Sequence, residues 1–230
     1  MKLTVLGKYG PYPKQGNTAC SGYLINDDQT NILLDMGSGV LTRLTNIIDI
    51  NSLDAIIFSH LHFDHTSDLL PLRYLLDELG KPIDIYVQYE DTAWYKLLFN
   101  HPLLNVHNIT KDSNLIIGKL KLSFSEMKHP VPTLAIKIIG DKEFLYTGDT
   151  QINTNLLNAV KACDYILADC SKSDNFKGPH MTIKDGLTIN NNSNAIIFAT
   201  HISPDYSPEK DYENYENIIV VNELQTYNLD

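Results

Sequence analysis

The chain has 230 residues, of which 43% are hydrophobic and 20% charged, and its acidic excess gives a formal net charge of -10. A chain of this length buries about 70% of its unfolded surface on folding, so it can form a core without disulfides. No apolar run approaches the ~20 residues of a membrane span. The two arginines and the acidic balance speak against an extended nucleic-acid surface. We expect one domain over residues 1–230, with no membrane partner and no extended nucleic-acid partner.

The N-terminus and the cysteines bear on the compartment. Residues 1–7 are typical of a strand that meets a glycine, without the apolar stretch and cleavage site of a secretory signal. Cys20, Cys163 and Cys170 are odd in number and lack C-x-x-C spacing, which favours buried free thiols over a disulfide framework or a zinc knuckle. Both observations predict a cytoplasmic protein.

Short β-branched runs alternate with segments of helical spacing along most of the chain. Strands are predicted at 3–6, 22–25, 32–34, 55–58, 83–87, 134–139, 144–146, 165–168, 195–199 and 218–221. Helices are predicted at 67–79, 91–99, 153–162 and 182–189. Consecutive strand-like pieces between 106 and 127 indicate mixed sheets, and the acidic stretch 204–216 is expected to be a solvated loop before a last strand.

The strongest signal in the sequence is an H-x-H-x-D-H segment directly after an apolar strand. It contains His60, His62, Asp64 and His65. A strand that ends in a tight loop can turn alternate side chains toward one pocket, while the following Asp-His pair reaches a neighbouring position. Neutral imidazoles suit zinc and similar cations, and a carboxylate among them tolerates a second cation nearby. The pattern predicts two adjacent metal sites better than it fits histidines with ordinary core or solvent contacts.

Three later segments repeat the arrangement of a strand followed by a polar residue. His129 stands between a strand and a proline-containing loop, Asp149 follows a strand and a glycine, and His201 follows another strand. Singly, each fits an ordinary turn, but strand ends are where binding and catalytic residues concentrate. His101 and His107 lie outside any such motif, and we interpret them as surface or core histidines.

These motifs, in this order, resemble the metallo-β-lactamase superfamily over nearly the whole chain. The segment L-L-D-M-G-S-G from Leu33 to Gly39 is similar to the strand and glycine turn that precede the metal loop of that family. The resemblance implies an α+β fold, an αββα sandwich of two mixed β-sheets with helices on the outer faces and metals at one edge.

The resemblance also implies two divalent cations, with zinc as the expected metal and manganese or iron as alternatives. The implied ligands are His60, His62 and His129 for one cation, Asp64, His65 and His201 for the other, and Asp149 for both. Such a pair, roughly 3.5 to 4 Å apart, can share a hydroxide and stabilise the attacking and leaving oxygens of a displacement.

Two further segments resemble the ribonuclease Z and phosphodiesterase branch of the superfamily. His180-Met181-Thr182 matches a His-x-Thr of that branch, whereas the stretch around Asp169 departs from its His-Glu-Ala-Thr-like pattern. The resemblance implies that His180 protonates the leaving alkoxide and that Asp169 orients it. We expect both to be catalytic, together with Asp64. In the alternative, His180 ends a Gly-Pro turn and Thr182 only caps the next helix.

The expected function is that of a phosphodiesterase whose metal-bridging hydroxide attacks phosphorus. A small or short phosphodiester, such as a cyclic nucleotide, is the expected substrate, because no segment matches the arm of several dozen residues with which ribonuclease Z grips tRNA. Three alternatives stay open. They are hydrolysis of a thioester or lactone at the same metals, a ribonuclease Z-like RNA endonuclease, and a metal-containing binding module without turnover. A homodimer is also compatible with the sequence.

Overall fold

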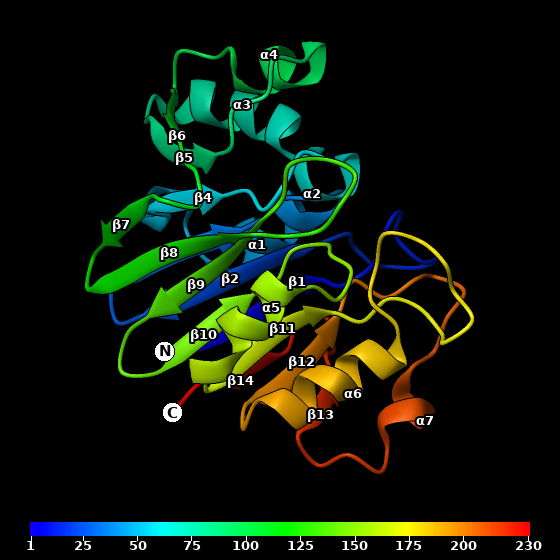
Figure 1. Ribbon diagram of the computed structural model, residues 1–230. Coiled ribbons are helices and arrows are strands. Elements are labelled where there is room, and N and C mark those ends of the chain that lie inside the picture. Colours follow the sequence, from blue (N-terminus) through cyan, green and yellow to red (C-terminus); the bar gives the residue numbers. More distant parts are fainter.

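Two mixed β-sheets of seven strands each face one another in the computed structural model, which describes residues 1–230 (Figure 1). The first sheet has the order β14-β1-β2-β3-β4-β5-β6. Its strands are β1 Lys2–Gly7, β2 Gly22–Asp27, β3 Thr30–Leu34, β4 Ala55–Ile57, β5 Ile83–Val87, β6 Leu104–Asn108 and β14 Thr226–Asn228. β14, β1, β2 and β3 pair antiparallel, and β3 to β6 pair parallel.

The second sheet repeats this division into an antiparallel and a parallel half. Its order is β13-β12-β11-β10-β9-β8-β7. Its strands are β7 Asn114–Ile117, β8 Leu120–Glu126, β9 Leu134–Ile139, β10 Glu143–Tyr146, β11 Tyr165–Asp169, β12 Ile196–Thr200 and β13 Ile218–Val220. β7 to β10 pair antiparallel, and β10 to β13 pair parallel.

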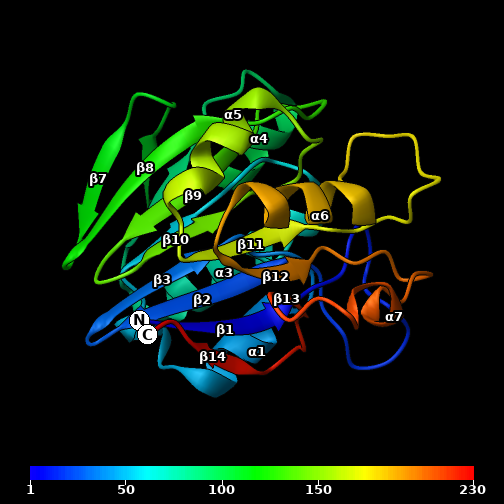
Figure 2. The same ribbon diagram turned by 60° about the horizontal axis from the view of Figure 1, so that its bottom comes forward.

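Helices cover the outer face of each sheet, and Figure 2 shows α1 below the first sheet and α5 and α6 above the second. Those beside the first sheet are α1 Val40–Ile47, α2 Phe63–Thr66, α3 Leu69–Leu79 and α4 Ala93–Phe99, with a 3-10 turn at Ile50–Ser52. Those beside the second sheet are α5 Thr154–Ala159, α6 Ile183–Asn192 and α7 Glu209–Tyr212, with a 3-10 turn at Val160–Ala162. The predicted αββα sandwich is therefore confirmed.

The alternation of side chains along the strands explains the three apolar layers. Phe144 and Tyr146 of β10 point between the two sheets, whereas Leu145 points to the helices outside. Likewise, Ile32 and Leu34 of β3 join the layer between the sheets, and Leu33 joins the layer under the outer helices. Because neighbouring residues of a strand face opposite sides, the central strands of both sheets, such as β3 and β11, are buried on both faces.

Three local expectations differ from the structure. The segment Val40–Ile47, which is not among the predicted helices, is a helix that begins after Gly39, whose φ is 89°. Its threonines are weak helix formers, and the burial of Val40 and Leu44 stabilises it instead. The acidic stretch predicted as a loop contains α7, because Tyr212 packs into the layer outside the second sheet. A further strand, β14, follows the one predicted to be last.

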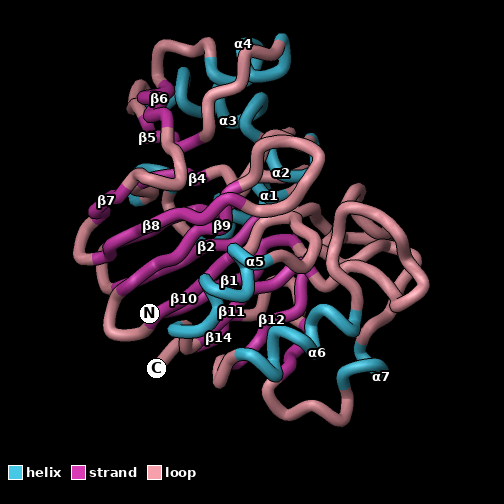
Figure 3. Tube along the Cα trace, in the orientation of Figure 1, coloured by secondary structure: helices cyan, strands magenta, loops and turns pink.

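The topology brings the carboxyl ends of the site-bearing strands to one edge. β10, β11 and β12 are parallel, and β8 runs in the direction of β10 because both are antiparallel to β9. Long loops follow β11 and β12 at the end of the sandwich away from the two termini (Figure 3). Side chains that end these strands are therefore placed close together, although they are far apart in the sequence.

Candidate metal centre

The three histidines implied for the first cation point their ring nitrogens at one another. His60 Nε2 lies 3.0 Å from His62 Nδ1, and His129 Nε2 lies 3.1 Å from the same His62 atom. His60 and His62 belong to the loop between β4 and α2, and His129 follows β8. A single nitrogen cannot donate to two rings at once, so three converging nitrogens suit a shared cation.

The residues implied for the second cation form a cluster beside the first. His201 Nε2 lies 3.1 Å from Asp64 Oδ2, and His65 Nε2 lies 3.7 Å from the same oxygen. Asp149 stands between the two clusters. Its Oδ2 is 3.5 Å from His60 Nε2 and 3.3 Å from His201 Nε2, and its Oδ1 is 3.3 Å from His65 Nε2. The structure thus brings all seven predicted ligands together at one edge of the sandwich.

Electrostatics in the centre fit bound cations. Burial lowers the pKa of His60, His62 and His129, so these rings are neutral and keep lone pairs for a metal. Burial also opposes the charging of His65, but the surrounding carboxylates outweigh it and raise its pKa. In return, His65 and His201 overcome the effect of burial on Asp64 and lower the pKa of that carboxyl to about 2.

Two buried atoms at the middle of the centre have no hydrogen-bond partner, which is the clearest test of whether metals fit. They are His65 Nε2 and Asp149 Oδ1, which face each other at 3.3 Å without forming a hydrogen bond. Buried polar atoms are rarely left unpaired, because each costs about 1 to 3 kcal/mol. Both belong to the donor types that bind zinc and related cations. The residues present therefore fit a divalent metal centre.

In three of these histidines, the Nδ1 atom, which is not the nitrogen that points into the centre, contacts another group of the protein. His60 Nδ1 lies 3.0 Å from Ser59 Oγ, His65 Nδ1 lies 2.7 Å from Asp35 Oδ2, and His129 Nδ1 lies 3.2 Å from the Pro179 carbonyl oxygen. Such contacts fix ring orientation and, where Nδ1 donates, leave the Nε2 lone pair for a cation.

Asp35 is a buried carboxylate beside the centre that the sequence did not single out. Asp35 is fully buried at the end of β3. Its carboxylate accepts hydrogen bonds from the backbone N–H and the hydroxyl of Ser59, and from Tyr146 Oη at 2.6 Å. Its φ of 57° lies in the left-handed region, as does the φ of 54° at His201. Such backbone costs about 1 to 3 kcal/mol and concentrates at functional sites. The available signal was its position before the glycine turn Met36-Gly37.

The structure also brings His180 and Asp169 together. His180 Nδ1 lies 2.9 Å from Asp169 Oδ2, and the same nitrogen lies 3.8 Å from Asp149 Oδ2. The Asp169 carboxylate is held in turn by the backbone N–H groups of Thr150 and Ser171. Thr182 does cap α6, and its hydroxyl and Asp185 form a capping box. Helix capping and the contact with Asp169 therefore coexist in this segment.

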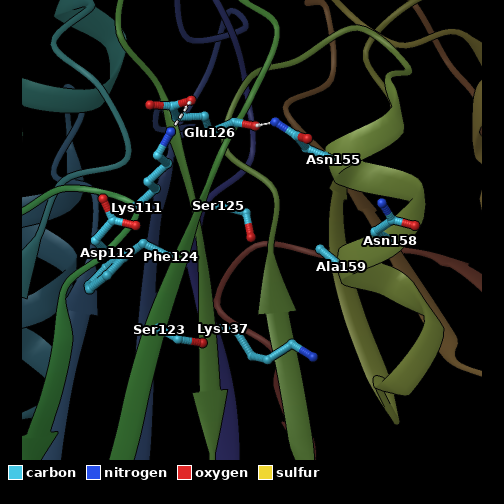
Figure 4. Close-up of a pocket in the computed structure, with 10 residues that line it drawn as sticks. All are labelled: Lys111, Asp112, Ser123, Phe124, Ser125, Glu126, Lys137, Asn155, Asn158 and Ala159. Atoms are coloured by element: carbon cyan, nitrogen blue, oxygen red, sulfur yellow. Dashed lines mark hydrogen bonds and ion pairs between the residues drawn. The ribbon is translucent and has the colours of Figure 1, made fainter.

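The centre opens into a cavity of about 330 Å³ lined by ten residues. These are Pro11, Leu61, His62, Phe63, Asp64, His129, Asp149, Pro179, His180 and His201. A larger cavity of about 510 Å³ lies between β8, β9 and α5 and contains none of the seven predicted ligands (Figure 4). There Lys111 pairs with Glu126 at 3.5 Å, whose carbonyl accepts from Asn155. With neither histidine nor cysteine, that cavity offers a poor metal site.

The remaining histidines and the cysteines lie as predicted. His101 Nε2 lies 3.3 Å from Asp77 Oδ1, and His107 Nε2 lies 3.1 Å from Asp84 Oδ1, both outside the centre. All three cysteines are buried and free. No helix of the structure combines the length and apolar character needed to cross a membrane.

Comparison with known proteins identifies the family. Residues 30–202 match the model of the Beta-lactamase superfamily domain, and the chain belongs to this superfamily. The probable metallo-hydrolase YhfI of Bacillus subtilis is 31% identical over 178 residues, which cover 74% of this chain and 72% of YhfI. Ribonuclease Z of Methanopyrus kandleri is 27% identical over 138 residues, which cover 59% of this chain and 49% of the relative.

Solved structures agree with this assignment. The crystal structure of YhfI superposes with a TM-score of 0.90 and 25% identity over 98% of both chains. A diphosphatase from the PhnP family shares the fold with a TM-score of 0.80 and 16% identity, over 100% of this chain and 98% of that chain. The superfamily match, the similarity to YhfI and the His/Asp clusters together make the protein a metallo-hydrolase with a divalent metal site.

Proposed function

We propose that this metallo-hydrolase is a phosphodiesterase acting on a small or short phosphodiester. One observation carries the proposal: His180 lines the same cavity as the metal-ligand candidates and is fixed there by Asp169. Hydrolysis of a phosphodiester expels an alkoxide, a poor leaving group, and a positioned proton donor accelerates that step. A thioester expels a thiolate, which needs this help less.

In this proposal the seven candidates divide as their geometry suggests. His60, His62 and His129 would hold one divalent cation, Asp64, His65 and His201 would hold the other, and Asp149 lies within reach of both groups. When bound, the pair of cations lowers the pKa of water toward neutrality and offsets negative charge on the phosphoryl oxygens. Imidazole-rich donor sets favour zinc, while manganese and iron use the same donors.

His180 has the geometry of a general acid. Asp169 accepts the Nδ1–H of His180, which leaves the opposite nitrogen to carry a proton for the leaving oxygen. The backbone N–H groups on Asp169 hold the carboxylate in place, so turning the ring would break its hydrogen bond to a fixed acceptor. The ring is 15% exposed, enough to touch a substrate in the cavity.

The similarity to a ribonuclease Z supports phosphodiester chemistry, and RNA cleavage is the second candidate. The charge of the protein argues against a long RNA substrate, since the net charge is -10 and none of the ten residues lining the cavity is Lys or Arg. Most affinity for nucleic acid comes from cationic contacts to phosphates. A short diester, whose single charge the metal centre can balance, suits this cavity better.

A substrate panel tests the proposal. Protein reconstituted separately with zinc and with manganese is assayed on bis(p-nitrophenyl) phosphate, an acyl thioester, a lactone and a tRNA precursor. We expect turnover of the diester with at least one metal and a kcat/KM at least tenfold above that of the carbonyl substrates. Faster hydrolysis of the thioester or lactone would overturn the assignment. Tight, salt-sensitive binding of the tRNA precursor together with its cleavage would instead favour the ribonuclease Z-like endonuclease.

A further inference from the structure

An exposed aromatic ring stands inside the metal loop itself. Phe63, the residue between His62 and Asp64, is 66% exposed and lines the cavity of the centre. Removing a phenylalanine ring from water is strongly favourable. A ring that stays exposed beside a binding cavity can therefore gain free energy by contacting a bound ligand. Its neighbours in the sequence are both ligand candidates, so its place relative to the centre is fixed.

A second aromatic ring supports Phe63. The centroid of the Trp94 ring lies 4.6 Å from that of Phe63, and the two planes meet at 64°. Trp94 belongs to α4 and packs against the apolar layer outside the first sheet. The backbone of α2 is anchored as well, because the Met36 N–H donates to the His65 carbonyl at 2.7 Å. Phe63 and Trp94 therefore form an aromatic wall, in which Phe63 packs on a ring of a helix and its backbone is anchored to Met36.

The rest of the cavity limits what can lie against this wall. Asp64 and Asp149 contribute negative charge, and no lysine or arginine is present to neutralise a second phosphate. Leu61, Pro11 and Pro179 add apolar surface. A ligand that satisfies these conditions carries one phosphate charge at the centre and a flat, uncharged group beside it. Nucleobases meet the second condition, because every base has a face that stacks on an aromatic ring.

We propose that Phe63, supported by Trp94, is a specificity-determining residue that stacks a nucleobase of a singly charged phosphodiester. This inference rests on the proposed phosphodiesterase function and adds the substrate class. Stacking acts in the bound ground state and in the transition state alike, so its loss raises KM more than it lowers kcat. One base-aromatic stack contributes about 1 to 3 kcal/mol, which corresponds to about a 5- to 150-fold change in KM.

Two esters with the same leaving group test whether Phe63 stacks a nucleobase. Thymidine 5′-(p-nitrophenyl) phosphate and methyl p-nitrophenyl phosphate are compared on the metal-loaded protein, so that the reacting centre is shared and only the nucleoside differs. We expect the wild type to prefer the thymidine ester, and F63A and F63L to reduce that preference about 5- to 150-fold through KM. F63Y and F63W, which restore a flat ring, should recover most of it.

Tyr74 provides the matched control, because it is an aromatic residue 77% exposed on α3 that does not line the cavity. Y74A should retain the wild-type preference. An unchanged preference in F63A, or wild-type behaviour of F63L, would overturn the stacking role while leaving the phosphodiesterase function intact. Failure of the wild type to hydrolyse either ester would instead overturn the proposed function and this inference with it.

Binding alone gives a second readout, because Trp94 is the single tryptophan of the chain. Thymidine 5′-monophosphate is titrated into the metal-loaded protein while Trp94 emission is followed, with ribose 5-phosphate as the probe that lacks a base. We expect a saturable change with the nucleotide and a much weaker one with the sugar phosphate. Equal responses to both probes would contradict the inference.

Discussion

Asp35 Oδ2 lies 2.7 Å from His65 Nδ1, and both side chains are fully buried. The same oxygen accepts the hydroxyl hydrogens of Ser59 and Tyr146. The carboxylate at the end of β3 therefore joins both sheets at the point where His65 faces Asp149. A residue that does not line the cavity thus orients a predicted metal ligand.

Replacing Asp35 with asparagine is expected to weaken the second metal site. The amide can still accept from Ser59, but it removes the charge that holds the His65 Nδ1–H, so zinc affinity should fall about 10- to 100-fold. Competition with a chromogenic chelator measures the change. Y146F, which removes one hydrogen bond and keeps the carboxylate, is the control and should alter affinity less. Equal affinity in D35N and wild type would contradict this role.

The role assigned to His180 predicts a dependence on the leaving group. In H180A, hydrolysis of bis(p-nitrophenyl) phosphate should change by less than about threefold, because p-nitrophenolate leaves without a proton. Cleavage of adenosine 2′,3′-cyclic phosphate, which expels an alkoxide, should slow by about 100- to 10,000-fold. H107A, which changes a histidine outside the centre, should match wild type on both. A uniform loss on both substrates would argue for a structural role of His180.

Gly10 is expected to tolerate no side chain. A Cβ there would lie 2.0 Å from His201 Nε2, so alanine must displace the ring from the centre. G10A should lose most of its activity and bind about one metal fewer per chain, as measured by elemental analysis. In G140A, where the added Cβ meets one flexible leucine atom at 3.0 Å, the metal content should stay unchanged. Wild-type metal content in G10A would show that His201 is not a ligand.

Arg43 is expected to stabilise the fold through a buried ion pair. Its guanidinium lies 2.6 Å from Glu223 and also donates to the backbone carbonyls of Leu6 and Asn17, which joins α1 to segments near both ends of the chain. Removing one partner of a buried pair costs about 3 to 5 kcal/mol. Urea unfolding of R43A should show a loss of this size, and K161A, on an exposed turn, should show little change. A loss below about 1 kcal/mol would refute the role.

Much of the architecture is predictable from the sequence because its elements have strong local patterns. Most strands of both sheets are short β-branched runs that local patterns predict, whereas the sandwich arrangement is implied by the family resemblance. Helix α1 is not among the predicted helices, although Val40, Leu44 and Ile47 have helical spacing, because a segment of eight residues depends on packing for its stability. The same holds for α7, where one buried tyrosine outweighs an acidic composition.

The candidate site likewise combines residues that a local motif indicates with residues that only the fold brings together. The H-x-H-x-D-H spacing indicates the metal loop, because its ligand candidates are neighbours in the sequence. Asp35, which contacts His65, lies 30 residues before it, and Trp94, which contacts Phe63, lies 31 residues after it. No short motif links either residue to the loop. Such partnerships depend on how the strands and helices are brought together, so they become visible in the folded chain alone.

The metal content of the reconstituted protein tests the central claim most directly. Wild type dialysed against zinc and freed of excess metal should contain two zinc ions per chain, and D149A should contain fewer than one, since Asp149 contacts both ligand clusters. D141A, an aspartate in the turn between β9 and β10, should retain two. Fewer than one zinc per wild-type chain, or two in D149A, would contradict the account.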